Sequence, residues 1–188
     1  MFYTVECSYT DPESEKVWND FYNLEKLPAL ISVIGFSTSQ RFQFLTPGCP
    51  VYLAIHTVKD AGVITSEEYK LKGGGNFSRW QKHITDWHRN LYECEGMAPA
   101  VASDEFLLLS THPLSVIEGQ GCRALNMQAS GLDRTPARRI AYVVKRDIAA
   151  QFADVPGVYL YEPLTSQLTN LPKTRSHGGL YARAGTGH

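Results

Sequence analysis

The chain has 188 residues, 43% of them hydrophobic and 20% charged, and this composition is typical of one large or two small globular domains. The formal net charge of −1 provides no general attraction to nucleic acid or to anionic membranes, so we expect neither as a partner. No apolar run approaches the roughly 18 residues of a membrane span, and the first residues lack a signal-peptide pattern. The four cysteines are far apart and form no CxxC pair. We therefore expect reduced thiols and a cytoplasmic protein.

Alternating residues over Phe2–Cys7 predict a first strand with two distinct faces. Asp11 and Pro12 are typical of a helix start, and we expect this helix to end near Pro28, whose ring interferes with the preceding turn. Gly35 allows the chain to turn into the next strand. Further strands are expected over Phe36–Leu45, before the Thr46–Gly48 break, and over Val51–Val58.

A second helix is predicted after the flexible Gly73–Asn76 segment, over Phe77–Tyr92. The reason is that Trp80, Ile84, Trp87 and Leu91 recur at helical spacing. The strongly apolar segment Glu105–Thr111 then predicts a fourth strand. The order strand, helix, strand, strand, helix, strand indicates an α+β protein, a ferredoxin-like two-layer sandwich. We assign it to residues 1–112.

Residues 113–188 are less regular and form either a C-terminal extension or a degenerate second repeat. Strands are predicted over Ala137–Val144 and Val158–Pro163, with a short helix over Arg146–Ala153 between them. An internal similarity supports a repeat, although helix–Gly–strand corners are common enough to match by chance. It pairs Leu30, Val33, Gly35 and Phe36 with Phe152, Val155, Gly157 and Val158. The segment Thr174–His188 is expected to be loosely held.

The stretch FYNLEKLPALISVIGFSTSQRF, starting at Phe21, resembles the dimeric α+β barrel superfamily, and within it the EthD-like proteins. In those proteins a helix with a YN-x-x-H-x-P pattern leads through xPGF into a strand. VYLAIHTV and WQKHITDWHRNLY resemble later segments, so the similarity covers about residues 1–112. Tyr22, Asn23 and Pro28 match the pattern, whereas Lys26 replaces the histidine and Ile34 the proline.

The resemblance implies a barrel closed by two sheets, usually from two subunits, and hence a homodimer. The sequence leaves open whether the two sheets come from two subunits or from two halves of one chain. Pockets of such proteins lie within the barrel or between the sheet and its helices. The superfamily includes isomerases, cyclases, dehydratases, cofactor-free monooxygenases, haem-binding proteins and proteins without known activity.

Three polar strand residues are the first catalytic candidates. A free imidazole titrates near neutrality, so His56 could move protons, or it could be a hydrogen-bonded structural histidine. Arg41 could hold a carboxylate or an enolate, or could form an ordinary ion pair. Glu6 could be the partner of Arg41, a general base or simply an exposed carboxylate.

Lys26 could act as a base if buried, or could be a surface charge at a helix end. Tyr22 and Tyr52 are candidate substrate-binding residues, since a phenol can donate to a ligand oxygen, but core packing explains them as well. Trp80 and Trp87 could line a pocket for an aromatic ligand, although core packing fits their spacing too.

We expect no metal site. His83 and His88 are five residues apart, about 140° around a helix, and no HExxH motif or Cys/His cluster is present. No organic cofactor is expected, although haem bound through a single histidine stays open.

The sequence thus favours a cofactor-free acid–base enzyme acting on an apolar, aromatic or polyketide-like small molecule. Hydro-lyase, isomerase and cyclase chemistry are its most natural forms. The alternatives are a cofactor-independent or haem-dependent monooxygenase, and a non-catalytic dimeric binding protein.

Overall fold

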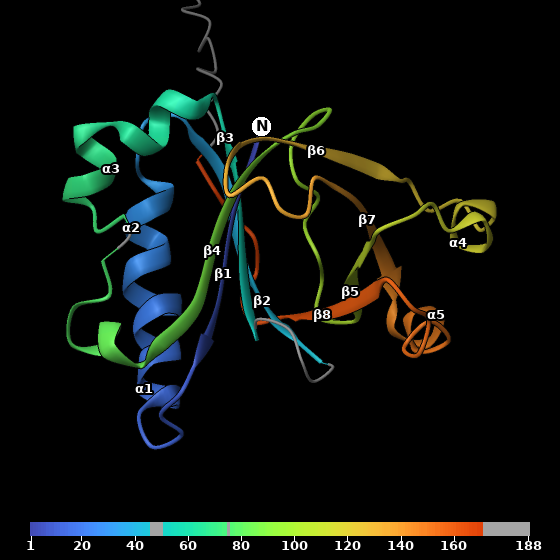
Figure 1. Ribbon diagram of the computed structural model, residues 1–188, viewed down its shortest axis with the longest axis horizontal. Coiled ribbons are helices and arrows are strands. Elements are labelled where there is room, and N and C mark those ends of the chain that lie inside the picture. The colour runs from blue at the N-terminus through green and yellow to red at the C-terminus, as the bar shows by residue number, and fades with distance from the viewer. Residues whose placement is uncertain (46–50, 75, 171–188) are drawn as a thin grey trace, which may run out of the picture.

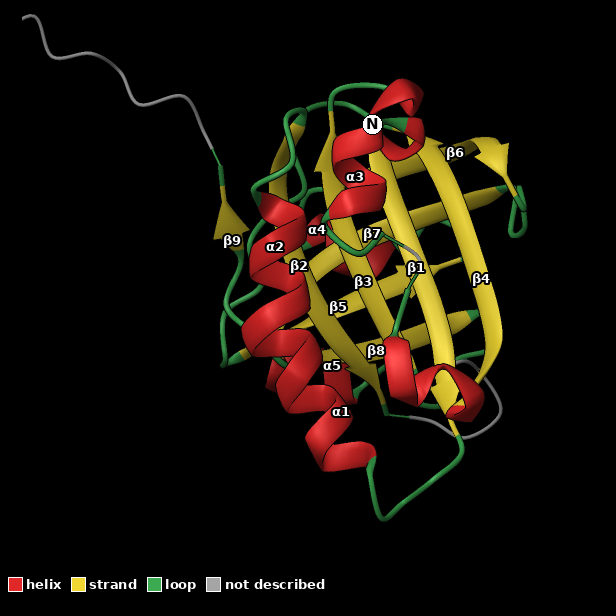
Figure 2. Cartoon of the chain, turned by 90° about the vertical axis from the view of Figure 1, so that its left-hand side faces the viewer, coloured by secondary structure: helices red, strands yellow, loops and turns green. Residues whose placement is uncertain are grey.

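Eight antiparallel strands close into a barrel within a single chain (Figures 1 and 2). The computed structural model describes residues 1–45, 51–74 and 76–170. The strands follow one another around the barrel in the order β3-β1-β4-β6-β7-β5-β8-β2, and β2 pairs back onto β3. Their bounds are β1 (Phe2–Tyr9), β2 (Phe36–Phe44), β3 (Tyr52–Val58), β4 (Ile84–Glu93), β5 (Glu105–Ser110), β6 (Leu125–Leu132), β7 (Arg138–Lys145) and β8 (Val158–Pro163); a two-residue strand, β9 (Leu168–Thr169), is added on β2.

The barrel consists of two halves with the same strand order. In the first half the order across the sheet is β4-β1-β3-β2, and in the second, read from its other edge, it is β8-β5-β7-β6, which is fourth-first-third-second in both. The pairs β4–β6 and β2–β8 join the halves. The α+β barrel expected from the resemblance is therefore present, but this barrel does not form by pairing sheets from two subunits.

Helices cover the outside of the barrel on two opposite sides, as Figure 1 shows. In the described residues, α1 (Glu15–Phe21), a π-helical turn (Tyr22–Lys26), α2 (Leu27–Ile31) and α3 (Glu67–Leu71) lie on the first half, with short 3₁₀ turns at Ala61–Thr65 and Ser78–His83. The smaller α4 (Ser115–Gly119) and α5 (Arg146–Ala150) lie on the second half.

Pro28 does not end the first helix, which runs on to Ile31. The π-helical turn just before it explains this, because Leu27 N–H bonds to the Tyr22 carbonyl five residues back. This wider turn changes the local hydrogen-bond ladder at the point where a proline lacks a donor. The helix also begins later than predicted, at Glu15 rather than near Asp11.

The predicted helix over Phe77–Tyr92 is wrong, because most of that segment is strand β4. The register between β1 and β4 shifts between Glu6 and Ser8, and Asp86 opposite this shift has a positive φ of 52°. This bulge reverses the alternation of side chains, so that Ile84 and Trp87 both face the helix layer. A bulged strand therefore imitates the spacing of three and four residues that is typical of a helix.

The segment predicted as the fourth strand of the first domain, Glu105–Thr111, pairs with the C-terminal strands instead. As β5 it lies between β7 and β8 and is the first strand of the second half. The two helix–Gly–strand corners that the internal similarity matches, at Gly35 and Gly157, do not occupy equivalent places in the two halves. Gly35 precedes the second strand of its half, whereas Gly157 precedes the fourth, and both have positive φ angles, of 98° and 78°.

The hydrophobic core has an inner and an outer part. Side chains from both halves fill the barrel, among them Phe2, Phe42, Tyr92, Leu107 and Tyr161. Two further clusters fill the spaces between the barrel and its helices. The predicted features Thr46–Gly48, Thr174–His188 and Cys49, and residue 75 of the Gly73–Asn76 segment, lie outside the described residues. Cys7, Cys94 and Cys122 are free thiols.

Candidate functional site

An ion pair inside the barrel links the two halves of the chain. Glu6 lies on the inner face of β1, and its Oε1 accepts a hydrogen bond of 2.8 Å from Nη2 of Arg139 on β7. The two side chains are only 4% and 12% exposed. Replacing a buried ion pair with apolar residues often costs no stability. The Glu6–Arg139 pair is therefore better explained by a role in binding or catalysis than by a contribution to stability.

One hydrogen-bond donor of Arg139, Nη1, is unpaired within the part of the chain that the structure describes. Burial disfavours its charge, but the Glu6 carboxylate, with Tyr92 and Tyr161, outweighs burial and raises the pKa of Arg139 above its ordinary value. Its Nη1 is buried and has no hydrogen-bond partner among the described residues. Burial, opposed by Arg139, also raises the pKa of Tyr92 to about 12, so this phenol stays protonated.

A pocket of about 290 Å³ opens onto the Glu6–Arg139 pair. Its other lining residues are mostly apolar or aromatic and come mainly from the second half: Leu109, Ser110, Thr111, Thr135, Pro136, Tyr159 and Tyr161. Ligand pockets typically span roughly 300–1,000 Å³, so this volume suits a small molecule of a few rings. An apolar wall with one acid and one cation at its edge can bind such a molecule and move a proton.

A larger hollow of about 690 Å³ lies between residues 100–103 and 163–169. Its lining residues, which include Val101, Leu164 and Gln167, carry no ionisable side chain. Because proton transfer needs such a group, the smaller pocket at Glu6 is the stronger candidate for a catalytic site.

Glu6 and Arg41 do not form the pair considered from the sequence. Arg41 is on the opposite face of the sheet, where its Nη1 donates to Asn23 Oδ1 at 2.7 Å and its Nη2 to Asn19 Oδ1 at 3.0 Å. Its guanidinium carbon lies 3.9 Å from the centre of the Tyr22 ring. Arg41 is 1% exposed, and burial lowers its pKa. These contacts make it a structural link between the first helix and the sheet.

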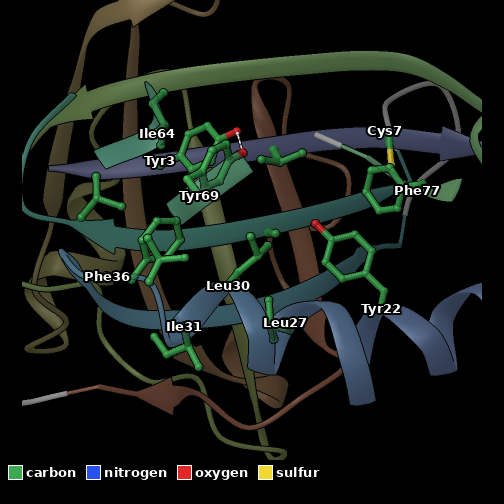
Figure 3. Close-up of a cluster of buried hydrophobic side chains, with 14 of the residues drawn as sticks. Tyr3, Cys7, Tyr22, Leu27, Leu30, Ile31, Phe36, Ile64, Tyr69 and Phe77 are labelled. Carbon is green, nitrogen blue, oxygen red and sulfur yellow. Dashed lines mark hydrogen bonds between the residues drawn. The ribbon is translucent and has the colours of Figure 1, made fainter. Parts of the chain in front are cut away.

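The other candidates from the sequence also lie in the outer core of the first half. Figure 3 shows Tyr22 projecting from the helix toward Phe77 and Cys7 on the sheet side. Tyr52 donates to Glu15 Oε1 at 2.7 Å, Trp80 stacks near Phe21, and Trp87 meets the Phe77 ring at 5.4 Å. None of these side chains lines the pocket at Glu6.

Lys26 is buried rather than on the surface. Its Nζ donates to the carbonyl oxygens of Gly73 and Asn76, the latter at 2.7 Å, and lies 4.2 Å from the Phe77 ring centre. Burial lowers the pKa of Lys26 to about 8. The lysine thereby fastens the segment after α3 to the first helix.

His56 is fully buried beneath the helices, on the outer face of β3. Its Nδ1 is 2.6 Å from Ser39 Oγ, and its Nε2 has no hydrogen-bond partner among the described residues. Burial, helped by the nearby Lys26 charge, lowers the pKa of His56 to about 3. The imidazole is therefore neutral at physiological pH.

We expect His56 to make the protein less stable in acid. The pKa of His56 is about 3 in the folded state against about 6.5 for an unperturbed histidine, so below pH 6.5 only the unfolded state gains a proton there. The loss of unfolding free energy from this group is about 1.4 kcal/mol per pH unit between those values. It should appear in urea unfolding between about pH 7.5 and about pH 5, and His56→Asn should remove it. His88→Asn is the control, because it removes a half-exposed histidine instead of a buried one. Equal slopes of unfolding free energy against pH in the wild type and His56→Asn would contradict the expectation.

The sequence interpretation does not identify Arg139 or the tyrosines of β8, because it places every candidate site residue in residues 1–112 and none in the C-terminal extension or degenerate repeat. A signal was present in the alternation of β7. Arg139 shares a face with Ala141 and Val143, which pack in the barrel interior. A lone arginine on the inner face of an apolar strand needs a partner and marks a candidate site.

No metal-binding cluster of histidine, cysteine and acidic residues occurs in the part of the chain that the structure describes. Within that same part, none of the helices is long and apolar enough to cross a membrane.

Comparison with known proteins identifies the fold but no sequence family. No family model matches the chain, and no curated protein matches it in sequence at a significant level. Among solved structures, an "anthrone oxidase-like protein" matches with a TM-score of 0.54 and 11% identity, covering 89% of this chain and 92% of that one.

Two further solved structures share the fold. A "putative monooxygenase" from Fusobacterium nucleatum subsp. nucleatum has a TM-score of 0.53 and 8% identity, covering 90% of this chain and 98% of the other. Another "putative monooxygenase", from Lactobacillus acidophilus, has a TM-score of 0.51 and 8% identity, with coverages of 88% and 97%. At these identities the similarity establishes only that this chain shares the fold of these proteins.

Proposed function

We propose that this chain is an oxygenase that oxidises a small, mostly apolar aromatic molecule in the Glu6–Arg139 pocket, using dioxygen without an organic cofactor. The observation that carries the proposal is the buried ion pair at the edge of an apolar pocket, with one unpaired guanidinium donor. The monooxygenase-like neighbours favour oxygenation over the lyase, isomerase or cyclase reactions that the sequence favoured.

The two charged residues take different roles in the proposed reaction. Glu6 accepts a proton from an acidic C–H or O–H group of the substrate. The guanidinium of Arg139, which lines the pocket, stabilises the substrate oxygen on which negative charge develops, because preorganised positive charge is effective in an apolar site. The electron-rich anion then reduces dioxygen. In total the CH₂ group of a compound such as anthrone becomes C=O, or a phenol loses its O–H hydrogen and one ring C–H hydrogen to become a quinone. In both cases one atom of dioxygen becomes the new carbonyl oxygen and the other leaves as water with the two hydrogens.

The proposal predicts oxygen uptake by the purified chain with a suitable aromatic substrate. We would measure uptake with an oxygen electrode for phenol, 1-naphthol and anthrone, and follow ¹⁸O from labelled dioxygen into the product by mass spectrometry. We expect uptake of one dioxygen per product molecule and incorporation of one ¹⁸O atom into the product. A metal chelator should leave the rate of uptake unchanged. No uptake above that of heat-denatured protein for any compound would overturn the proposal. A Soret band together with haem-dependent uptake would assign the chemistry to haem instead.

A further inference from the structure

The loop from β6 to β7, residues 132–136, forms one wall of the pocket through Thr135 and Pro136. Leu132 and Arg134 in this loop have positive φ angles of 62° and 55°. Residues other than glycine avoid this region, so the local sequence alone does not favour the loop conformation. Contacts from elsewhere must hold it.

Those contacts come from β4, in the other half of the chain. The Asn90 side chain donates to the Thr135 carbonyl at 3.0 Å and accepts from the Thr135 N–H at 3.2 Å. The Tyr92 hydroxyl donates to the Pro136 carbonyl at 2.9 Å. Both side chains are fully buried. A third contact joins the Arg89 N–H to Asp133 Oδ2 at 2.7 Å.

The chemistry of these contacts is specific. A side-chain amide can both donate to and accept from one backbone residue, whereas aspartate at position 90, although equal in shape, would turn a carboxylate toward the Thr135 carbonyl. An unpaired buried polar group is costly, and the loop would move to relieve it. Arg139 is less affected, because β7 is paired with both β5 and β6.

We propose that Asn90 and Tyr92 are positioning residues that set the width of the pocket and so decide which size of aromatic substrate it accepts. They clamp the 132–136 loop, and the clamp keeps Thr135 and Pro136 against the bound molecule. The identity of the ligand in this inference rests on the proposed function. The clamp rests only on the hydrogen bonds described above. Loosening the clamp widens the pocket and favours larger ring systems over smaller ones.

The test compares Asn90→Asp and Tyr92→Phe with Tyr142→Phe as the matched control. Tyr142 is also fully buried, and its hydroxyl accepts from the Leu114 N–H at 3.0 Å, but on the outer side of the second half, away from the pocket. Calorimetric titration with phenol, 1-naphthol and anthrone gives the affinity for each ring size. Amide hydrogen exchange measured at Thr135 reports the clamp without any ligand.

In both clamp variants we expect the affinity ratio of anthrone to phenol to rise at least fivefold, and exchange at Thr135 to speed up at least tenfold. Tyr142→Phe should change neither. With a substrate that is turned over, the effect of Asn90→Asp should fall on KM and leave kcat within about twofold.

Each outcome separates the two claims. An unchanged affinity ratio in both clamp variants, with oxygen uptake intact in the wild type, overturns the clamp alone. A shifted ratio without oxygen uptake supports the clamp and overturns the oxygenase. Failure of the wild type to bind any of the three compounds overturns the proposed ligand class and with it the oxygenase, and unchanged exchange at Thr135 in both clamp variants would then overturn the clamp as well.

Discussion

Glutamine in place of Glu6 is expected to lower the rate of oxygen uptake about 10²- to 10⁴-fold, the range typical for loss of a general base. Glutamine is nearly equal in shape and can still accept the hydrogen bond from Arg139 Nη2, but it cannot take a proton from the substrate. The loss should therefore fall on kcat, with little change in KM. Steady-state uptake by Glu6→Gln, with the substrate that the wild type turns over best, measures this effect.

Glu105→Gln is the matched control for this substitution. Glu105 is also a strand glutamate beside a cation, with Oε2 3.9 Å from Lys145 Nζ, but it does not line the pocket. Its replacement should leave the rate within about twofold. A rate for Glu6→Gln within threefold of the wild type, with binding preserved, would remove Glu6 from the mechanism.

Alanine in place of Gly35 is expected to lower the free energy of unfolding by about 2 to 5 kcal/mol. The positive φ of 98° at this position is disfavoured for a residue with a Cβ, at a cost of about 1–2 kcal/mol. A Cβ would also lie 2.5 Å from Cγ2 of the buried Val63, and such overpacking costs about 1–3 kcal/mol. Urea unfolding followed by tryptophan fluorescence measures the loss.

Gly119→Ala tests whether the loss at Gly35 is specific. Gly119 ends α4, and a Cβ there would meet no atom within 4 Å. Alanine is preferred over glycine in a helix by about 0.5–1 kcal/mol, so this variant should be as stable as the wild type or slightly more stable. Equal stability of the Gly35→Ala variant and the wild type would show that Val63 and the corner move aside at no cost.

Much of the fold could be predicted because each strand element carries its own local pattern. The strands near Phe2, Phe36 and Val158 were found within two residues of their bounds, since alternation or β-branched composition needs no tertiary context. The strand β6 and the helices α3 and α4 were missed. Both helices are only five residues long, too short for a helical period to be recognised.

The errors in the fold have tertiary causes. The bulge at Asp86 exists because β4 pairs with β1 in a shifted register, and no local residue pattern reveals that pairing. Closure within one chain depends on β4 meeting β6 and on β2 meeting β8, contacts between segments roughly 40 and 120 residues apart. A similarity confined to residues 1–112 could not reveal them.

The site was predicted less well than the fold. Glu6 was named as a candidate, but its partner Arg139 is 133 residues away and was not. The other named residues are polar or aromatic and lie close together, as expected of a site, yet they pack against helices rather than around a pocket. A polar residue on a strand can face either side of a sheet, and only the closed barrel shows which side holds the pocket.

Joining both sheets in one chain has a consequence for symmetry. In a barrel made of two identical subunits, a twofold axis repeats every inner residue, so a pair between the first strand of one sheet and the third strand of the other occurs twice. Here Glu6 on β1 and Arg139 on β7 form such a pair, whereas the corresponding strands β5 and β3 place apolar residues such as Leu107 and Ile55 in the barrel. The fused chain can thus have one polarised site in place of two equivalent ones. Barrel closure is also intramolecular, so dilution alone does not open it.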